Sequence, residues 1–386
     1  MPNLGLFPAV GYWLIDGDIF LDRKFYDGLA LYKKLWGHGL SVFIRQSNNP
    51  IPKFGLVRYK KEDSFFSLIK LNTIDKTQLK NLTVILASAD EFRNLELSRL
   101  CKEVNKPCIY YVEYILETRL QINWLSPKSF LSKLKSAVWL IITEIKRRSA
   151  FQFATNLQAN GMPAYTAYSG ILPTLLYFDT RSTEGMIISE HELDTRLEKL
   201  AHQKKLRMAF SGRINKMKGA DDLISLAKTL VKKNCDFQLD IFGDGELYKE
   251  LKIEIANSTE LSKRVILHGA VSFADELIPY IKDNIDLFVC CHKQSDPSCT
   301  YLETYSCGVP IVGYDNKAHS GILELADVGW EVTMNDIEAL AQKVLEINAN
   351  RSLLAEKSRN ARLFAMGNTF MASFQKRIDN CLTLDK

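Results

Sequence analysis

Short apolar runs alternate with amphipathic segments through the second half of the chain. Gly, Pro or polar residues flank each apolar run, and each amphipathic segment repeats its apolar residues at a helical spacing. The pattern predicts strands over 207–210, 237–242, 265–267, 287–291 and 311–314, and helices over 220–233, 246–257, 274–282 and 300–307. Strands and helices that alternate across short loops predict a parallel, doubly wound sheet covered on both faces.

The first half shows the same alternation less clearly. The pattern predicts strands over 40–45, 84–87 and 108–112, and helices over 25–36, 91–105 and 130–148. This favours a second Rossmann-like sheet, so the expected fold class is α/β with two doubly wound domains. The expected division is a first domain over 1–175, a linker region over 176–204, a second domain over 205–365 and a C-terminal helix in 366–386 that packs back on the first domain.

Length and composition agree with two globular domains. The chain has 386 residues, which is too many for one ordinary core, and 46% of them are hydrophobic. No apolar run approaches the roughly 20 residues of a membrane-spanning helix, and the first residues lack the basic segment of a secretory signal. Eight cysteines form no CxxC pair or zinc-type spacing, so we expect reduced thiols and a cytoplasmic protein.

The charge is unevenly distributed. The formal net charge is +5, yet residues 1–150 hold 23 Lys and Arg against 14 Asp and Glu. A basic first half suggests a membrane surface or a nucleic acid as partner. Residues 126–148 place basic residues around an apolar centre with Trp139, which favours a helix on an anionic membrane surface. A core helix with solvated ends is the alternative, and no aromatic–basic motif supports nucleic-acid binding.

The segment 286–314 reads as a strand, a polar loop, a helix and a second strand. Asp296 lies in the loop and Glu303 on the helix. A carboxylate can accept hydrogen bonds from two neighbouring hydroxyls, and N–H groups at a helix start can hold phosphate. This makes four residues at the helix start further candidates: Ser298, Cys299, Thr300 and Tyr301. The pattern predicts a nucleotide-sugar site. The structural alternatives are a capping box from Thr300 to Glu303 and a turn at Asp296.

Arg213 and Lys218 flank a similar loop, which leaves a predicted strand at Gly212 and enters a helix. A nucleoside diphosphate gains negative charge as it leaves a sugar, and two cations aimed at it would lower that barrier. Two ordinary surface cations are the alternative.

Two other strand ends carry candidate residues. Gly243, Asp244 and Gly245 form a tight loop in which glycines would let a ligand approach the backbone, although an ordinary turn has the same pattern. Glu113 follows a first-domain strand, where it could act as a general base toward an acceptor or be an exposed loop carboxylate.

Most of 207–314 resembles the retaining glycosyltransferases of the GT-B fold, family 4 type (glycosyl transferases group 1). The resemblance rests on the segments FSGRINKMKGADDLISLAK, FQLDIFGDGEL, VILHGAVSFADELIPYI and SDPSCTYLETYSCGVPIV. It implies two domains that face each other across a cleft and a base-binding backbone near His268 and Val271. A structural role is the alternative for His268. The chain departs from the family in three places. Ser295 and Asp296 stand where a first glutamate is usual, and Glu113 and Tyr114 follow the strand where a histidine is usual. The N-terminal Gly-rich loop of the family is not evident, because Gly11, Gly17 and Gly28 are too dispersed.

The resemblance implies a hexosyltransferase that moves a sugar from a UDP- or GDP-linked donor to a saccharide or lipid-linked acceptor. The expected setting is bacterial surface glycan synthesis at the inner face of the cytoplasmic membrane, with retention of configuration. We expect no metal and no cofactor, because Arg213, Lys218 and a helix start would neutralise the diphosphate. The alternatives are a nucleotide-sugar epimerase and a non-catalytic nucleotide-sugar-binding subunit.

Overall fold

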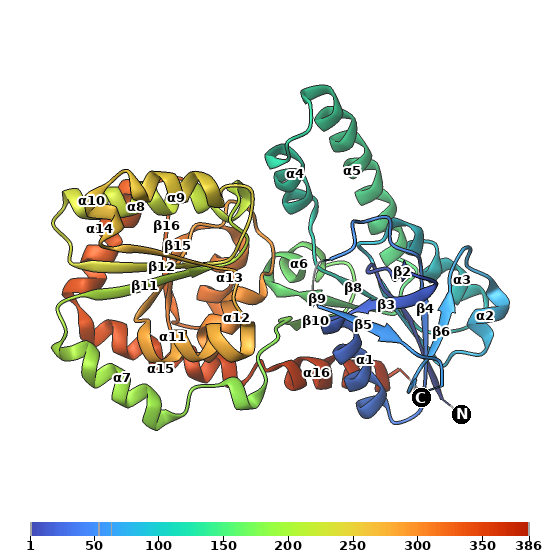
Figure 1. Cartoon of the computed structure of the whole chain (residues 1–386). Helices are drawn as coiled ribbons and strands as arrows, with labels where there is room; N and C mark the ends of the chain where they lie inside the picture. Colours follow the sequence, from blue (N-terminus) through green and yellow to red (C-terminus); the bar gives the residue numbers. More distant parts are fainter. Residues whose placement is uncertain (1, 53–54, 63, 385–386) are drawn as a thin grey trace. The chain divides into compact units, whose positions relative to one another are not determined.

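The computed structural model describes residues 2–52, 55–62 and 64–384 (Figure 1). The chain forms two compact units. Unit 1 contains Met1–Leu116, Ser129–Tyr177 and Met371–Lys386, and unit 2 contains Glu117–Lys128 and Phe178–Phe370. Each unit is built around one parallel sheet.

Unit 1 has a seven-stranded parallel sheet in the order β10-β9-β8-β7-β1-β4-β6. Its strands are β1 (Asn3–Phe7), β4 (Gly39–Ile44), β6 (Ser67–Lys70), β7 (Val84–Ser88), β8 (Cys108–Val112), β9 (Asn156–Asn160) and β10 (Thr174–Tyr177). A small antiparallel sheet contains β2 (Trp13–Ile15), β3 (Asp18–Asp22) and β5 (Leu56–Tyr59). The helices are α1 (Arg23–Trp36), α2 (Lys76–Lys80), η1 (Phe92–Asn94), α3 (Leu97–Glu103), α5 (Phe130–Phe151), α6 (Gly161–Tyr168) and α16 (Phe370–Leu382).

Unit 2 has a six-stranded parallel sheet in the order β13-β12-β11-β14-β15-β16. Its strands are β11 (Leu206–Ser211), β12 (Phe237–Phe242), β13 (Val265–Gly269), β14 (Leu287–Cys290), β15 (Ile311–Tyr314) and β16 (Gly329–Val332). The helices before β14 are α4 (Leu116–Leu125), η2 (Glu184–Met186), α7 (Glu190–His202), η3 (Lys216–Lys218), α8 (Ala220–Lys232), α9 (Tyr248–Ala256), α10 (Thr259–Ser262), the π-helix η4 (Phe273–Leu277) and α11 (Ile278–Asn284). Those after it are α12 (Cys299–Ser306), α13 (Lys317–Leu325), α14 (Ile337–Ala349) and α15 (Arg351–Met366).

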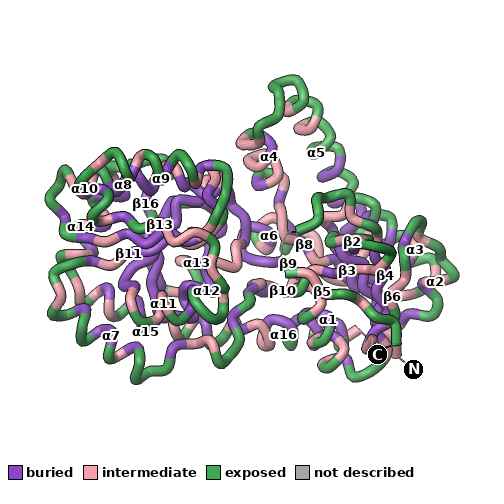
Figure 2. Tube along the Cα trace, viewed as in Figure 1, coloured by how far each residue is buried: buried purple, intermediate pink, exposed green. Residues whose placement is uncertain are grey.

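The central strands are apolar along their whole length because helices cover both faces of each sheet. Every residue of β7, β14 and β15 is buried, and Figure 2 shows this burial along the middle of both sheets. The helices contribute one apolar face each: α8 buries Leu223, Ile224, Ala227 and Leu230 at helical spacing.

Both sheets have the strand order of the classic dinucleotide-binding fold. The chain reverses its direction of travel across the sheet between β1 and β7 in unit 1, and between β11 and β14 in unit 2. Ligands of such sheets bind outside the carboxyl ends of the strands at this switch point. The order therefore marks the loops after β11 and β14 as the first place to look for a site in unit 2.

The predicted doubly wound α/β fold class is confirmed, with local differences. The predicted helix 91–105 is split into η1 and α3, and 274–282 begins as a π-helix before α11. The antiparallel sheet of β2, β3 and β5 was not expected, because its short strands carry no long apolar run. Residues 176–204, expected as a linker region, contain α7 and lie almost wholly in unit 2.

Arg377 attaches the C-terminal helix α16 to unit 1. Its Nε donates to Gln158 Oε1 (2.9 Å), and its carbonyl accepts from Gln158 Nε2 (3.0 Å). The guanidinium also lies 4.5 Å from the ring centre of Tyr177 and 5.3 Å from that of Tyr32. Both polar side chains are buried, so the charge is held by aromatic faces and one amide rather than by water.

We expect Arg377→Ala to lower the free energy of unfolding by about 3 kcal/mol, because it removes a charged hydrogen bond and leaves a buried Gln158 oxygen without it. Chemical denaturation of the full chain measures the effect. Gln375→Ala is the control, since Gln375 is exposed on the same helix and should change stability by no more than about 0.5 kcal/mol. Equal stability of the two variants would contradict the anchoring role.

Candidate functional site

The loops that leave β11, β12 and β14 touch through their backbones at glycines. An added Cβ on Gly219 would lie 2.0 Å from the carbonyl oxygen of Cys291, and one on Gly243 would lie 1.9 Å from that of Gly212. Gly219 and Gly243 also have positive φ angles of 65° and 126°. Only glycine fits these positions, so the predicted Gly243 loop is first of all a packing feature.

Lys218 and Asp296 meet at this switch point. Lys218 Nζ lies 3.2 Å from Asp296 Oδ1 and 3.0 Å from Oδ2, and both side chains are buried. Lys218 ends η3, where its N–H is capped by the side chain of Asn215. The sequence predicts separate roles for them, Lys218 toward phosphate and Asp296 toward sugar hydroxyls, and the structure joins them in one ion pair.

Arg213 lies in the same loop as Lys218 but differs in environment. It is exposed, and its side chain forms no hydrogen bond or ion pair with the described part of the chain. An arginine without a carboxylate partner at the carboxyl end of β11 is available to an anion.

Glu303 is held by an arginine that the sequence analysis missed. Arg181 donates through Nε to Glu303 Oε1 (2.7 Å) and through Nη2 to Oε2 (3.1 Å), and it lies 4.0 Å from the ring centre of Phe273. Burial lowers the pKa of Arg181, but the Glu303 carboxylate more than offsets this and raises it. Arg181 belongs to the polar segment expected as a linker, so no local signal indicated it.

The capping-box alternative for Glu303 is wrong. Helix α12 begins at Cys299 with Ser298 as N-cap, and the Glu303 carboxylate pairs with Arg181 instead of reaching the helix start. Ser298 Oγ donates to Thr300 Oγ1 (3.1 Å), so the first turn is polar.

Tyr301 contributes to the core rather than to the surface of this turn. Its hydroxyl donates to Asn316 Oδ1 (3.4 Å), and its N–H bonds to the Ser298 carbonyl (3.3 Å). The first-turn N–H groups still give this helix end partial positive charge.

His268 is part of a partly buried hydrogen-bonded network around Asp240. Its Nε2 lies 2.7 Å from Asp240 Oδ1, its ring stacks on Phe242 with centres 4.2 Å apart, and Tyr280 also donates to Asp240 (3.0 Å). Burial and the Asp240 charge raise the pKa of Tyr280 to about 12. The structural alternative for His268 is thus what its contacts favour.

The remaining strand-end candidates in unit 2 lie near these loops. Asp244 is exposed and accepts from the N–H of Gly245 (2.7 Å), as a turn residue does. Val271 is half-buried in the loop after β13.

His292 is a buried imidazole in the same loop as Asp296. It follows β14, and neither ring nitrogen has a hydrogen-bond partner within the described residues. Burial, then the positive charge of Lys218 and the electrostatic effect of the neighbouring His319, lower the pKa of His292 well below the usual value. The Tyr301 ring lies 5.8 Å from His292 and 5.7 Å from His319 between ring centres. Both imidazoles are therefore neutral at neutral pH, and both pack against the Tyr301 ring.

Glu113 lies at the carboxyl end of β8 in unit 1. Its N–H donates to Asp90 Oδ2 (2.8 Å), and Asp90 also accepts from the buried Arg147 (3.0 Å). The loops after β7 and β8 are thus tied together beside the switch point of this sheet.

The described residues contain no group of three or more His, Cys, Asp or Glu side chains placed to hold a metal ion. Across residues 2–52, 55–62 and 64–384, no helix is both long enough and apolar enough to cross a bilayer.

Residues 194–364, which lie within unit 2, match the family model of the glycosyl transferases group 1. No curated protein matches the sequence. Anabaena Alr3699/HepE, solved in complex with UDP, is 16% identical, with 99% of this chain and 100% of that chain covered and a TM-score of 0.64. Its complex with UDP-glucose gives 17% identity, 99% coverage of both chains and a TM-score of 0.60.

Two other solved structures are similar over the whole chain. Sucrose-phosphate synthase from Thermosynechococcus elongatus is 13% identical, with 99% of this chain and 98% of that chain covered and a TM-score of 0.62. WaaG, a glycosyltransferase involved in lipopolysaccharide biosynthesis, is 13% identical, with 99% of both chains covered and a TM-score of 0.58. The GT-B fold class with two Rossmann-like domains is thereby confirmed, and unit 2 carries the segment that matches the group 1 glycosyltransferase model.

The buried imidazole of His319 predicts a loss of stability in acid. Burial lowers its pKa to about 4, although its hydrogen bond to the Tyr314 carbonyl opposes the shift. Between the unfolded value of about 6.5 and the folded value, the unfolded chain binds a proton that the folded chain does not. We expect the free energy of unfolding to fall by about 3 kcal/mol as the pH is lowered through this range, and to be independent of this group above it.

Denaturation at several pH values compares the protein with His319→Asn, which should flatten this part of the profile. His202→Asn, at an exposed position of α7, controls for the loss of a histidine. An unchanged slope in His319→Asn would show that another group causes the acid sensitivity.

Proposed function

We propose that the protein is a retaining glycosyltransferase of family 4 type that transfers a hexose from a UDP- or GDP-linked donor to a saccharide or lipid-linked acceptor. The observation that carries the proposal is that Arg213, Lys218 and the start of α12 follow the neighbouring strands β11 and β14 at the switch point of unit 2. Cations and helix N–H groups at one strand end suit a pyrophosphate.

Breaking the bond between the sugar and the diphosphate places negative charge on the leaving group. Arg213 supplies a forked donor for phosphate oxygens, and the first turn of α12, at Cys299 and Thr300, supplies N–H groups. Lys218 has three N–H donors and gives two of its contacts to Asp296, which leaves one for a phosphate oxygen. These fixed charges would stabilise the transition state without a metal ion or cofactor.

The two carboxylates keep free acceptor capacity although both are ion-paired. Each carboxylate has about four lone-pair positions, and Arg181 occupies two on Glu303. The others suit the two ribose hydroxyls, with Arg181 as a positioning residue. Asp296, turned toward Lys218, suits hydroxyls of the transferred sugar, and the loop from His268 to Val271 suits the base.

Several observations support a UDP-sugar donor and a surface-glycan acceptor. HepE was solved with UDP and with UDP-glucose, and WaaG acts in lipopolysaccharide biosynthesis.

Unit 1 would supply the remaining roles. Glu113 at the end of β8 would activate the acceptor hydroxyl, and α5 would place the enzyme on the inner face of the cytoplasmic membrane.

Arg213→Gln should weaken the binding of UDP-glucose about ten-fold or more, because a charged hydrogen bond to phosphate is lost. Titration calorimetry with UDP-glucose and GDP-mannose measures it. Lys216→Gln is the matched control in the same loop, since Lys216 is exposed and has no partner in the described structure. Wild-type affinity in Arg213→Gln would contradict the proposed diphosphate position.

Glu113→Gln should leave donor affinity unchanged and lower transfer about a hundred-fold, which is the usual contribution of a general base. Glu62→Gln, at an exposed position of unit 1, is the control. Unchanged transfer in Glu113→Gln would assign the proton to the leaving phosphate.

Chromatography of the donor incubated alone tests the epimerase alternative, which predicts an isomerised sugar without acceptor. Donor binding without turnover on any acceptor would indicate a binding subunit.

A further inference from the structure

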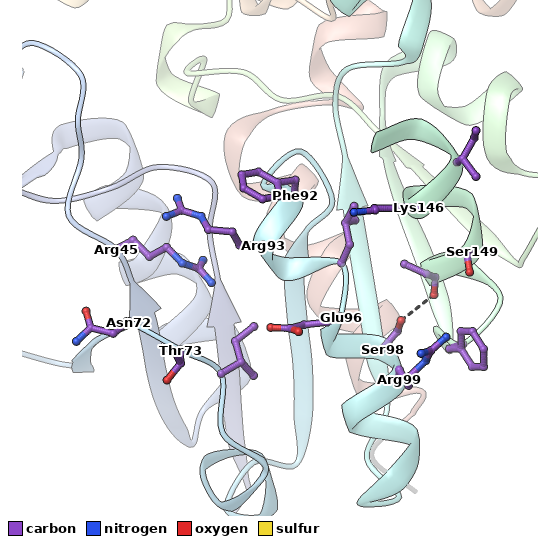
Figure 3. A pocket seen from close by; sticks show the side chains of 15 residues that line it. Arg45, Asn72, Thr73, Phe92, Arg93, Glu96, Ser98, Arg99, Lys146 and Ser149 are labelled. Atoms are coloured by element: carbon purple, nitrogen blue, oxygen red, sulfur yellow. Dashed lines mark hydrogen bonds between the residues drawn. The ribbon is translucent and has the colours of Figure 1, made fainter. Parts of the chain in front are cut away.

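A basic pocket of about 740 Å³ lies in unit 1, beside the carboxyl ends of β4 and β6. Four cationic side chains and one carboxylate line it: Arg45, Arg93, Arg99, Lys146 and Glu96. Figure 3 shows Arg45 and Arg93 on one side, Lys146 and Arg99 on the other, and Glu96 between them. Small polar side chains such as Thr73 and Ser149 complete the lining.

Three of these cations have no carboxylate partner within the described residues. Arg93, by contrast, makes a direct two-point contact with Glu91. Arg45 gives one Nη1 hydrogen bond to Asn94 (2.8 Å), while its buried Nε has no partner. Arg99 lies over the Phe153 ring (5.1 Å), which leaves the edge of its guanidinium open. The pocket therefore has an excess of positive charge and unused donors, which suit a phosphate group.

An exposed apolar stripe on α5 leads to the pocket. The stripe consists of residues at helical spacing on one face of the helix: Leu131, Leu134, Val138, Ile141, Ile142 and Ile145. Leu131 is 78% exposed and Ile145 is 65% exposed. The residues that α5 buries, including Arg147 and Phe151, lie on the opposite face. The expected alternative of a core helix with solvated ends does not describe this arrangement.

The stripe and the pocket form one continuous surface. Ile145 belongs to both, and Phe92, which also lines the pocket, packs edge-on against Trp139 with ring centres 5.6 Å apart. Lys135 and Lys146 lie along the same flank of the stripe by their positions on the helix. Apolar side chains next to unpaired cations match the two parts of an anionic lipid.

We propose that this pocket binds the phosphate of an anionic phospholipid, and that the α5 stripe enters the hydrocarbon at the surface of the same bilayer. The inference deepens the membrane contact proposed above and rests on it. The chemistry favours a lipid over a nucleic acid, because the stripe is aliphatic and offers few flat rings for base stacking. It favours a lipid over a free anion, because a soluble phosphate would leave the stripe in water.

Co-sedimentation with vesicles tests the proposal. The full chain should bind vesicles of phosphatidylcholine mixed with phosphatidylglycerol more tightly than vesicles of phosphatidylcholine alone. In the mixed vesicles, the double variant Arg45→Gln and Arg99→Gln should bind at least about 25-fold more weakly, since each cation near an anionic surface contributes about five-fold. Lys34→Gln with Lys80→Gln is the control that removes the same charge. Both lysines are exposed and precede strands, so they lie near the amino ends of the strands, whereas the pocket lies at the carboxyl ends.

The outcomes separate the possible sources of binding. If the two double variants lose vesicle binding equally, the attraction is a general effect of charge, and the proposed role of the pocket is rejected. If inorganic phosphate causes a thermal shift that depends on Arg45, and the protein binds neither kind of vesicle, the pocket binds a soluble anion and the lipid proposal is rejected. Val138→Ser with Ile142→Ser should weaken binding to mixed vesicles, and wild-type binding in that variant would overturn the role of the stripe. UDP-glucose affinity is measured on the same variants, so a failure here is distinguishable from a failure of the donor site.

Discussion

Close backbone contact between the loops after β11, β12 and β14 is the constraint on which the unit 2 site depends. Gly219 and Gly243 allow carbonyl oxygens of neighbouring loops to approach where no Cβ would fit. This contact fixes the loop that carries Lys218 against the strand that leads to Asp296. The chemistry of the site is therefore set by backbone geometry before any ligand arrives, and the glycines act through packing.

Both carboxylates of the site are paired with cations. Lys218 is paired with Asp296 and Glu303 with Arg181, so the carboxylates are oriented although they lie in a buried region. A buried ion pair gains little net stability, because desolvation of both groups opposes their attraction. Its value here is positional: each carboxylate is held in one direction with part of its acceptor capacity unused. Arg213 is exposed and has no carboxylate partner within the described residues, which makes it a natural first contact for an anion.

The sequence predicts the architecture well because strands buried on both faces are mainly apolar, as the short apolar runs of β7 and β14 show. It predicts Arg213, Lys218 and Asp296 in the loops that follow strands, and Glu303 on the next helix, because strand ends are visible as breaks in the apolar pattern. It could not predict that Arg181 meets Glu303, since 122 positions separate them and only the tertiary fold joins them. The exposed side of α5 was equally hidden, because an amphipathic pattern does not say which apolar face the core leaves uncovered.

The placement of α16 has a consequence for how the protein is made. Unit 1 contains both the first strand of the chain and this late helix, whose Arg377 contacts Gln158 and Tyr177. On the ribosome, unit 2 is complete before the last part of unit 1 has been synthesised. Until α16 has been synthesised, the surface of the first sheet around Tyr32 and Gln158 therefore stays uncovered. Biogenesis thus passes through a state in which the domain translated first is the one finished last.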